Sequence, residues 1–318
     1  MRREFMNALH RYLIAALFLV MAAGCKYYDD YFDKDDDDGV IAAEEIIVWD
    51  SVSAGDWHSL AIKTDGTLWA WGRNDQGQLG LGVWSDRIAP EQVGIENGWT
   101  AVSSGGLHSL GVMINGTLWT WGFNLYGQLG LGSHKDSTIP VMATPATDWA
   151  AVSAGSYHSL ARKIDGSLWA CGYNSSGQLG DGTIVNRTVF NQVGTATDWT
   201  DESAGAFHSL ALKTDGTLWA WGSNSDGQLG DDTFIDRSSP VRVGNGTNWV
   251  AASAGTSHSL ALRADGTLWA WGSNSSGQLG YDDLDESTIP VPVNSDMDWV
   301  AVSAGSSHSL AVKFDGTL

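Results

Sequence analysis

The chain has 318 residues and 17 tryptophans, and its 37 acidic residues against 17 basic ones give a formal net charge of −20. The chain has no cluster of lysine and arginine of the kind that binds a nucleic-acid backbone, so we expect no DNA or RNA partner. Cys25 and Cys171 are the only cysteines, which excludes a disulfide-stapled scaffold.

Residues 1–24 have the features of an export signal. Three arginines accompany an apolar run of 12 residues from Tyr12 to Ala23, which is too short to span a bilayer comfortably. The run leads into Cys25 and resembles the lipobox of bacterial lipoproteins, in which the cysteine becomes the lipidated first residue, although Ala22 stands where leucine is usual. The alternative is a plain secretory signal with a chance cysteine. We therefore expect export to the bacterial cell envelope (outer membrane or cell surface), with Cys25 as the lipid attachment site and the lipid as the only membrane contact.

Residues 25–48 are predicted to form an acidic tether. Five acids fall within the six positions 33–38, where they repel one another and resist packing. A calcium-binding loop is the alternative, with Asp36, Asp38 and Glu45 as ligands. That loop would begin at Lys34, where a carboxylate is needed, so we favour a solvated linker.

The remainder of the chain, 49–318, is an internal repeat of 50 residues. Complete copies cover 49–98, 99–148, 149–198, 199–248 and 249–298, and a partial copy covers 299–318. Each copy contains one histidine of an HSL triplet, and these are His58, His108, His158, His208, His258 and His308. Repetition at such a period predicts units that share one continuous core.

Each copy is predicted to contain four short antiparallel strands. In the second copy these are residues 99–103, 108–114 and 117–122, followed by a strand near Pro140 that begins at this proline or lies at an edge. Asn115-Gly116, which is Asp-Gly in the other copies, predicts a two-residue type I′ hairpin with both residues at positive φ.

Four antiparallel strands per unit at this period predict an all-β fold, a β-propeller with one four-stranded blade per copy. Trp69 and Trp71 fall on one face of the third strand, and we expect them to fill the space between neighbouring blades. Cys171 replaces the second tryptophan of its copy, which predicts a small core residue and not a nucleophile.

The repeated letters AGxxHSLAxKxDGTLWAWGxNxxGQLG resemble those of the regulator of chromosome condensation family, and the resemblance covers residues 49–318. It implies a seven-bladed propeller. It also makes a β-lactamase-inhibitor-like binder conceivable, since one bacterial protein of that kind has a similar architecture. The nucleotide-exchange activity of the eukaryotic namesake is not expected here, because an exported protein would not meet a nuclear GTPase.

The sixth copy stops at Leu318, within its third predicted strand. An open strand edge invites aggregation, so we expect a longer intact protein with the rest of blade six and a seventh blade. The alternative is a smaller ring closed by residues 40–48.

Loop positions that vary between copies are the candidates for binding. In an antiparallel meander, the loops between the first and second strands and between the third and fourth strands lie at the same end. The candidates in these loops are Trp57, Arg73, Trp84, Leu107, Phe123, Tyr157, Tyr173, Phe207 and Phe234. Aromatic side chains are enriched in binding hot spots, and residues 49–318 retain a charge of −15, which favours a basic partner. The alternative is that these side chains are ordinary loop residues scattered singly.

We therefore expect a protein-binding scaffold that uses this face. Carbohydrate binding through the same aromatic residues is the first alternative, and an enzyme domain beyond Leu318 is another. The six histidines lie in different blades, so we expect them to bind backbone groups of their own loops and not a shared metal. No catalytic residue or cofactor is expected in these repeats, and the chain is not expected to be an enzyme.

Overall fold

The computed structural model describes residues 48–281 and 286–318, and these form strands and loops without a helix. The export signal, Cys25 and the acidic tether up to residue 47 lie outside the described residues. Within them, no helix is long and apolar enough to cross a bilayer.

In the described part of the chain, five four-stranded antiparallel sheets and one two-stranded sheet follow one another. We call them blades one to six. Blades one and two consist of β1 (Trp49–Ala54), β2 (His58–Lys63), β3 (Thr67–Gly72), β4 (Arg87–Asn97), β5 (Trp99–Ser104), β6 (His108–Met113), β7 (Leu118–Gly122) and β8 (Ser137–Met142). Blades three and four consist of β9 (Trp149–Ala154), β10 (His158–Lys163), β11 (Leu168–Gly172), β12 (Arg187–Gln192), β13 (Trp199–Ala204), β14 (His208–Lys213), β15 (Leu218–Gly222) and β16 (Arg237–Arg242). Blade five and the partial blade six consist of β17 (Trp249–Ala254), β18 (His258–Arg263), β19 (Leu268–Ser273), β20 (Glu286–Pro292), β21 (Trp299–Ala304) and β22 (Ser309–Lys313).

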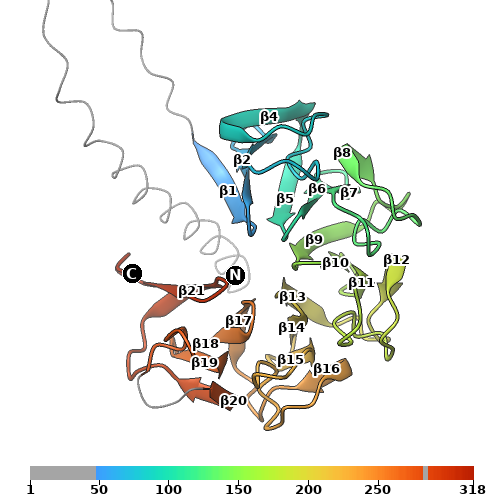
Figure 1. The fold of residues 1–318 in the computed structure, drawn as a ribbon. Coiled ribbons are helices and arrows are strands. Elements are labelled where there is room, and N and C mark those ends of the chain that lie inside the picture. The colour runs from blue at the N-terminus through green and yellow to red at the C-terminus, as the bar shows by residue number, and fades with distance from the viewer. Residues whose placement is uncertain (1–47, 282–285) are drawn as a thin grey trace, which may run out of the picture.

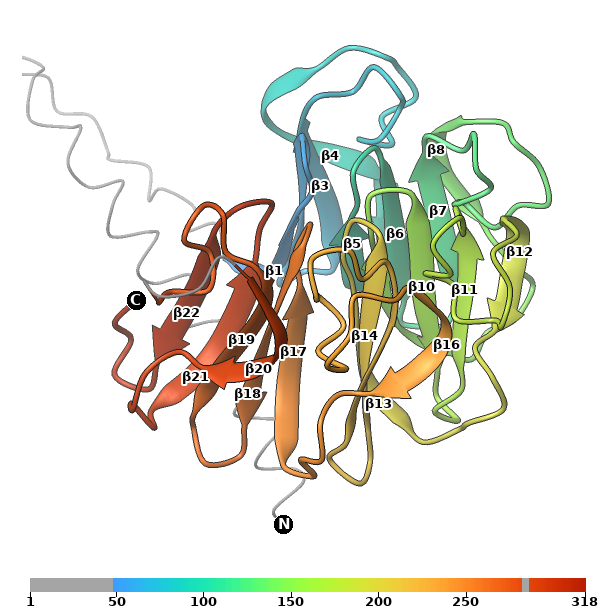
Figure 2. The same cartoon turned by 60° about the horizontal axis from the view of Figure 1, so that its bottom comes forward.

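The blades stand around a central axis, with the first strand of each blade innermost and the fourth outermost (Figure 1). Their strands run side by side and the loops gather at the two ends (Figure 2). The arc is open between β1 and β21 (Figure 1). The predicted all-β propeller is therefore confirmed, with the fourth strand at the edge as expected, although β8 begins three residues before Pro140.

The hairpin between the second and third strands differs from the prediction. Only the glycine has positive φ, for example 74° at Gly116. The Gly116 amide donates to Met113 O at 2.8 Å, and the Met113 amide donates to Thr117 O at 3.1 Å. These bonds define a type I turn closed by a glycine bulge, so the type I′ prediction is wrong. Asn115 is selected because its side-chain oxygen accepts hydrogen bonds from the Thr117 amide and hydroxyl, an Asx-type arrangement.

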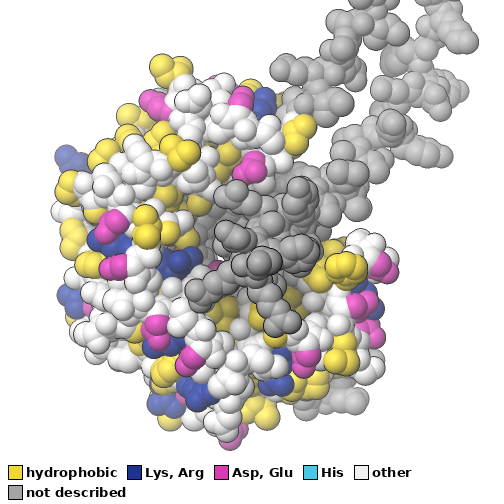
Figure 3. All heavy atoms as spheres, turned by 180° about the vertical axis from the view of Figure 1, so that it is seen from behind, with side chains coloured by type: hydrophobic (Ala, Val, Ile, Leu, Met, Phe, Trp, Pro, Cys, Tyr) yellow, Lys and Arg dark blue, Asp and Glu magenta, His cyan; other side chains and the backbone are white. Residues whose placement is uncertain are grey.

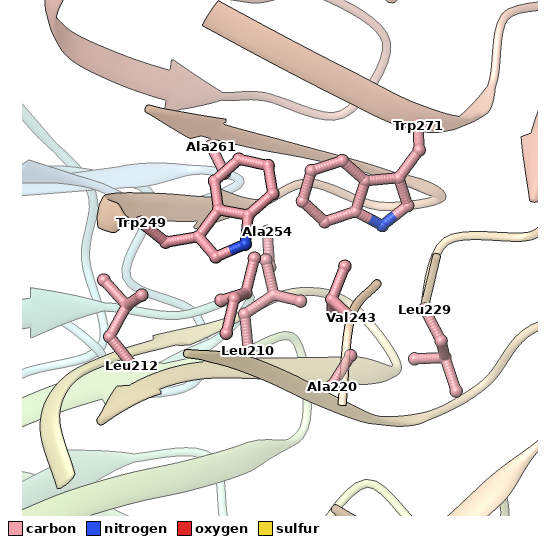
Figure 4. Close-up of a cluster of buried hydrophobic side chains, with 10 residues drawn as sticks. Leu210, Leu212, Ala220, Leu229, Val243, Trp249, Ala254, Ala261 and Trp271 are labelled. Carbon is pink, nitrogen blue, oxygen red and sulfur yellow. The ribbon is translucent and has the colours of Figure 1, made fainter. Parts of the chain in front are cut away.

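Neighbouring blades are joined by apolar packing that repeats from junction to junction. Figure 4 shows the junction of blades four and five, where Trp249 and Trp271 of blade five lie against Leu210, Leu229 and Val243 of blade four. The second tryptophan of the third strand is fully buried in blades two, four and five, and its indole nitrogen donates to a backbone carbonyl of the preceding blade. The expected inter-blade role is confirmed for these three equivalents of Trp71, whereas Trp71 itself is half-buried.

Blade three has Cys171 at this position, and a second substitution compensates for the missing indole. Cys171 is fully buried, and burial raises the pKa of its thiol well above the usual value. Phe190 replaces the proline found at its position in the other complete blades, and its ring lies over Gly130 as the Trp221 indole lies over Gly180. The prediction of a small core residue at Cys171 is confirmed, and the phenylalanine fills the space.

Candidate functional site

The loops at one end of the strands bring the two sets of varied residues together in pairs. In blade one the Arg73 amide donates to Trp57 O at 2.9 Å. The same bond recurs in the following blades, and it joins Phe123 to Leu107, Tyr173 to Tyr157 and Ser223 to Phe207. Each pair follows from strand register, because the histidine next to the first residue lies opposite the glycine next to the second, as in His58 and Gly72.

Five aromatic side chains of blades two, three and four form one contiguous group, which we call the aromatic cluster: Phe123, Tyr126, Tyr157, Tyr173 and Phe207. Ring centroids of its contacting pairs lie 4.8–6.5 Å apart, and most pairs meet edge to face. All five side chains are half-buried. The cluster therefore offers the ring edges and part of the ring faces of several blades as one surface.

Four of these five residues were predicted, and Tyr126 was missed. It lies at the centre of the cluster and contacts the rings of Phe123, Tyr157 and Tyr173. The corresponding residues in the other complete blades are Gln76, Ser176, Asp226 and Ser276, so Tyr126 is the only aromatic residue at its repeat position. That break in the repeat is the signal that could have found it.

The other predicted residues lie outside the cluster. Trp57 is 61% exposed, and the Arg73 guanidinium lies 5.6 Å from its ring centroid while pairing with Asp75. Leu107 is half-buried and holds Phe123 through its backbone. Trp84 and Phe234 are 54% and 51% exposed, and neither makes a ring contact with another described residue.

The loop that carries Phe123 and Tyr126 is held by buried amide side chains. The Asn124 amide donates to the carbonyls of Ser133 and Lys135 at 3.0 and 2.9 Å, and its oxygen accepts from the Leu129 amide at 3.0 Å. The Gln128 oxygen accepts from the amide of Tyr126 itself at 3.0 Å. Both amide side chains are fully buried, so the cluster stands on a preorganised loop.

The same end of the molecule opens onto the central axis. A cavity of about 370 Å³ is lined by the short loops after the innermost strands, where glycine and other small residues predominate. Asp56 is the one charged residue at its repeat position, and burial raises the pKa of its carboxyl. The aromatic cluster begins one residue further along these loops, at Tyr157 and Phe207.

The repeat histidines differ from the prediction. The imidazole Nε2 of His58 lies 2.8 Å from the hydroxyl of Ser109 in the next blade, and four more junctions have the same contact at 2.9–3.0 Å. The Ser109 hydroxyl donates to Gln78 O at 2.8 Å, so it accepts from His58 and the proton lies on Nε2. The histidines therefore join blades and do not bind backbone groups of their own loops.

Burial also fixes the charge of these histidines. It lowers the pKa of His58 and His258 to about 4, and those of His108, His158 and His208 to about 3. Their Nδ1 atoms are buried without a hydrogen-bond partner, which suits a neutral ring. Within residues 48–281 and 286–318, no three histidine, cysteine or acidic side chains gather as metal ligands.

The model of the regulator of chromosome condensation (RCC1) repeat matches residues 65–112, 115–162, 165–212, 215–262 and 265–312. A second model of the same repeat matches residues 49–78, 99–128, 149–178 and 249–278. These matches cover most of the chain.

Curated relatives match over single short segments. A zebrafish (Danio rerio) RCC2 homologue is 56% identical over 36 residues, and the Arabidopsis thaliana ultraviolet-B receptor UVR8 is 43% identical over 42 residues. The human probable E3 ubiquitin-protein ligase HERC3 is 46% identical over 43 residues. These segments span 11–13% of this chain and 4–10% of the relatives.

Two solved structures have a similar fold. Prp20p of Saccharomyces cerevisiae, described together with its binding properties to Gsp1p and histones, gives a TM-score of 0.74 at 24% identity and covers 83% of this chain and 69% of its own. Human WBSCR16 gives 0.73 at 24% identity, with 82% and 71% covered. By its sequence repeats and its fold, the chain belongs to the regulator of chromosome condensation (RCC1) repeat family.

Proposed function

We propose that the chain is a lipid-anchored, extracytoplasmic β-propeller that binds a protein partner through the aromatic cluster. The observation that carries this proposal is the cluster itself, in which Tyr126 joins rings from blades two and three and Tyr157 and Tyr173 extend the contact to Phe207 of blade four. Large half-buried aromatic side chains at one place on a rigid scaffold are typical of the energetic centre of a protein interface.

The environment of the cluster favours a partner with basic groups. Residues 1–24 contribute +2 and residues 25–48 contribute −7, which leaves −15 for the propeller. On the face of the propeller that Figure 3 shows, seen from behind relative to Figure 1, acidic and basic side chains lie next to one another. The net negative charge of the propeller attracts positively charged proteins and repels polyanions such as nucleic acid.

The packing of the rings favours a protein over a carbohydrate. A sugar stacks on a ring face, whereas the rings of Phe123 and Tyr157 use their faces and edges against Tyr126. Carbohydrate binding remains the second candidate, because Tyr157, Tyr173 and Tyr126 bring three phenol groups to one place. Hydroxyl groups beside ring surfaces suit sugar recognition.

Lipid attachment at Cys25 and export place the proposed partner outside the cytoplasm, so a GTPase partner is not part of the proposal. Metabolic labelling with radioactive palmitate tests the anchor. We expect label in the wild-type protein and none in Cys25→Ser. Equal labelling of the two proteins would reject the anchor without touching the binding proposal.

The binding proposal is tested with a partner isolated from cell-envelope extract, purified, and measured by titration calorimetry. The triple variant Phe123→Ala, Tyr126→Ala, Tyr157→Ala should weaken binding by about a hundredfold or more, because hot-spot residues contribute about 2 kcal/mol or more each. The matched control is Trp84→Ala with Phe234→Ala, which removes two exposed aromatic side chains outside the cluster.

Equal affinity of the wild type and the triple variant would contradict the proposal. A glycan array probed with the same proteins separates the two candidates, since binding of a sugar that the triple variant loses would favour carbohydrate recognition. Inhibition of a purified β-lactamase that depends on the cluster would identify that class of partner.

A further inference from the structure

At the opposite end of the strands, blades one, three, four and five each hold a lysine or arginine side chain against two tryptophan rings. The last residue of the second strand lies opposite the first tryptophan of the innermost strand, as Lys63 lies opposite Trp49. The Lys63 ammonium is 3.6 Å from the ring centroid of Trp69 and 5.6 Å from that of Trp49. The same arrangement recurs in blades three, four and five, with distances of 3.7–5.1 Å, for Lys163, Lys213 and Arg263.

Carboxylates complete the arrangement in blades three and four. Lys163 pairs with Asp148 at 3.2 Å, and Lys213 pairs with Asp198 at 3.1 Å. An alkylammonium ion therefore finds two indole rings and an acid at this place. Attraction to the ring quadrupoles strengthens as the cation loses water.

Blade two keeps the two tryptophans and lacks the cation. Met113 lies opposite Trp99, in the place of the lysine, and Gly98 replaces the aspartate. Trp99 and Trp119 keep the geometry of the other blades, with ring centroids 6.3 Å apart at 67°. Methionine is uncharged and one atom shorter than lysine, so it leaves the position of the ammonium group unfilled.

A groove of about 310 Å³ lies at this place, between the outer strand of blade one and the tryptophans of blade two. Its walls include Trp99, Met113, Trp119, Glu91 and Glu96. Strand β4 has 11 residues, against six or seven in the outer strands of the other complete blades, and its added length carries Glu96 into the wall.

The two carboxylates of the groove differ in their partners. Glu91 pairs with Arg87. Glu96 accepts a hydrogen bond from the Ile95 amide at 3.1 Å and forms no ion pair with another described residue. One carboxylate is therefore available to a cation that enters the groove.

We propose that this groove binds an external alkylammonium ion, the side chain of a lysine from another protein, over Trp99 and Trp119 and beside Glu96. The bound lysine takes the place that Lys63, Lys163 and Lys213 occupy in their own blades. This site lies at the other end of the strands from the aromatic cluster and does not depend on it.

The probe is Nα-acetyl-lysine-N-methylamide, titrated into the full chain and followed by the indole N–H signals of Trp99 and Trp119 in NMR spectra. We expect both signals to shift to saturation. The norleucine analogue, which has the same stem without the ammonium group, should bind at least about fivefold more weakly, because the cation contributes about 1 kcal/mol or more. Glu96→Gln should weaken binding of the lysine probe several-fold.

Two variants make the test specific. Met113→Lys restores the internal cation and should abolish the response, whereas Met113→Leu should keep it. Lys213→Met removes an internal cation beside Asp198 and should create a second responding pair, Trp199 and Trp219. The proposal is overturned by an absent response in the wild type, by an equal response to the norleucine analogue, or by a response that survives Met113→Lys.

Discussion

The junctions between blades and the loops at one end of the strands differ in how they use the repeat. A junction joins the same groups each time, as in the contacts of His158 with Ser209 and of Trp221 with Gln178 O. The loop end places different side chains at equivalent positions, from Tyr157 and Phe207 to Ser257. Identity in the buried layer makes stability independent of what the loops carry, so the loops are free to specialise.

The largest expected effect is that of pH on the free energy of unfolding, because a change of pH acts on the histidines of five junctions at once. Unfolded histidines titrate near pH 6.5, whereas burial lowers the pKa of the five junction histidines to between about 3 and about 4. Below pH 6.5 the unfolded chain binds more protons, so the free energy of unfolding falls by up to about 1.4 kcal/mol per pH unit for each histidine.

Buried carboxyl groups oppose this trend, and Glu202 does so within the pH range of the histidines. Burial raises the pKa of Glu202 to about 7. Its ionised form therefore destabilises the native state at neutral pH, and this destabilisation decreases as the pH falls and the carboxyl group takes up a proton. Urea denaturation at pH values from about 7.5 to about 5, roughly a unit or more on either side of the ordinary histidine pKa, measures how the free energy of unfolding changes with pH. His208→Gln should remove about one proton from the slope. A stability that stays level across this range would contradict a neutral buried histidine at each junction.

Removal of a junction tryptophan should have the next largest effect. Trp221→Ala deletes a fully buried indole and its hydrogen bond of 2.9 Å to Gln178 O. We expect a loss of about 3–5 kcal/mol of unfolding free energy, measured by denaturant titration. Trp71→Ala is the matched control, since Trp71 has the same repeat position in blade one but is only half-buried. Equal losses would mean that burial at the junction is not the source of stability.

The altered junction of blade three should show a coupling of intermediate size. Cys171→Trp alone should destabilise the protein by about 1–3 kcal/mol, because Phe190 already occupies the space of the indole. Adding Phe190→Pro restores the residues of the other blades and should recover most of that loss. Additive effects in this double-mutant cycle would contradict the compensation.

Truncation in the aromatic cluster should have the smallest effect on stability. Tyr126→Ala removes half-buried ring contacts, for which we expect a loss of about 1 kcal/mol in denaturant titration. Partner binding should nevertheless fall by tenfold or more, about 1.4 kcal/mol. A loss of stability as large as that of Trp221→Ala would make the cluster part of the core and not a binding surface.

The strands and their order could be predicted from the repeat, because alternation and turn residues are local signals. The hairpin type could not, since Asn115-Gly116 fits two kinds of turn and the bulge at Gly116 is decided by the bond between Met113 and Thr117. The partner of His58 could not be predicted either. Its contact with Ser109 spans two blades, and sequence spacing does not state which residues of neighbouring units face each other.

The candidate site could be predicted only in part, because sequence spacing does not state which residues of neighbouring units contact each other. Comparison of the copies identified Phe123, Tyr157, Tyr173 and Phe207, because these residues depart from the repeat. Whether such residues form one surface depends on the spacing of the blades, which brings Tyr157 and Phe207 to 6.2 Å and leaves Trp84 and Phe234 alone.

The sequence by itself determined the repeat, the all-β class, the family and the position of Cys171 in the core, because these depend on patterns within one unit. The tertiary structure decided which units touch and through which atoms. It placed Tyr126 at the centre of the aromatic cluster and left Trp99 and Trp119 without an internal cation. Contacts between units depend on the rotation from one blade to the next, and that rotation is set by packing across the junctions.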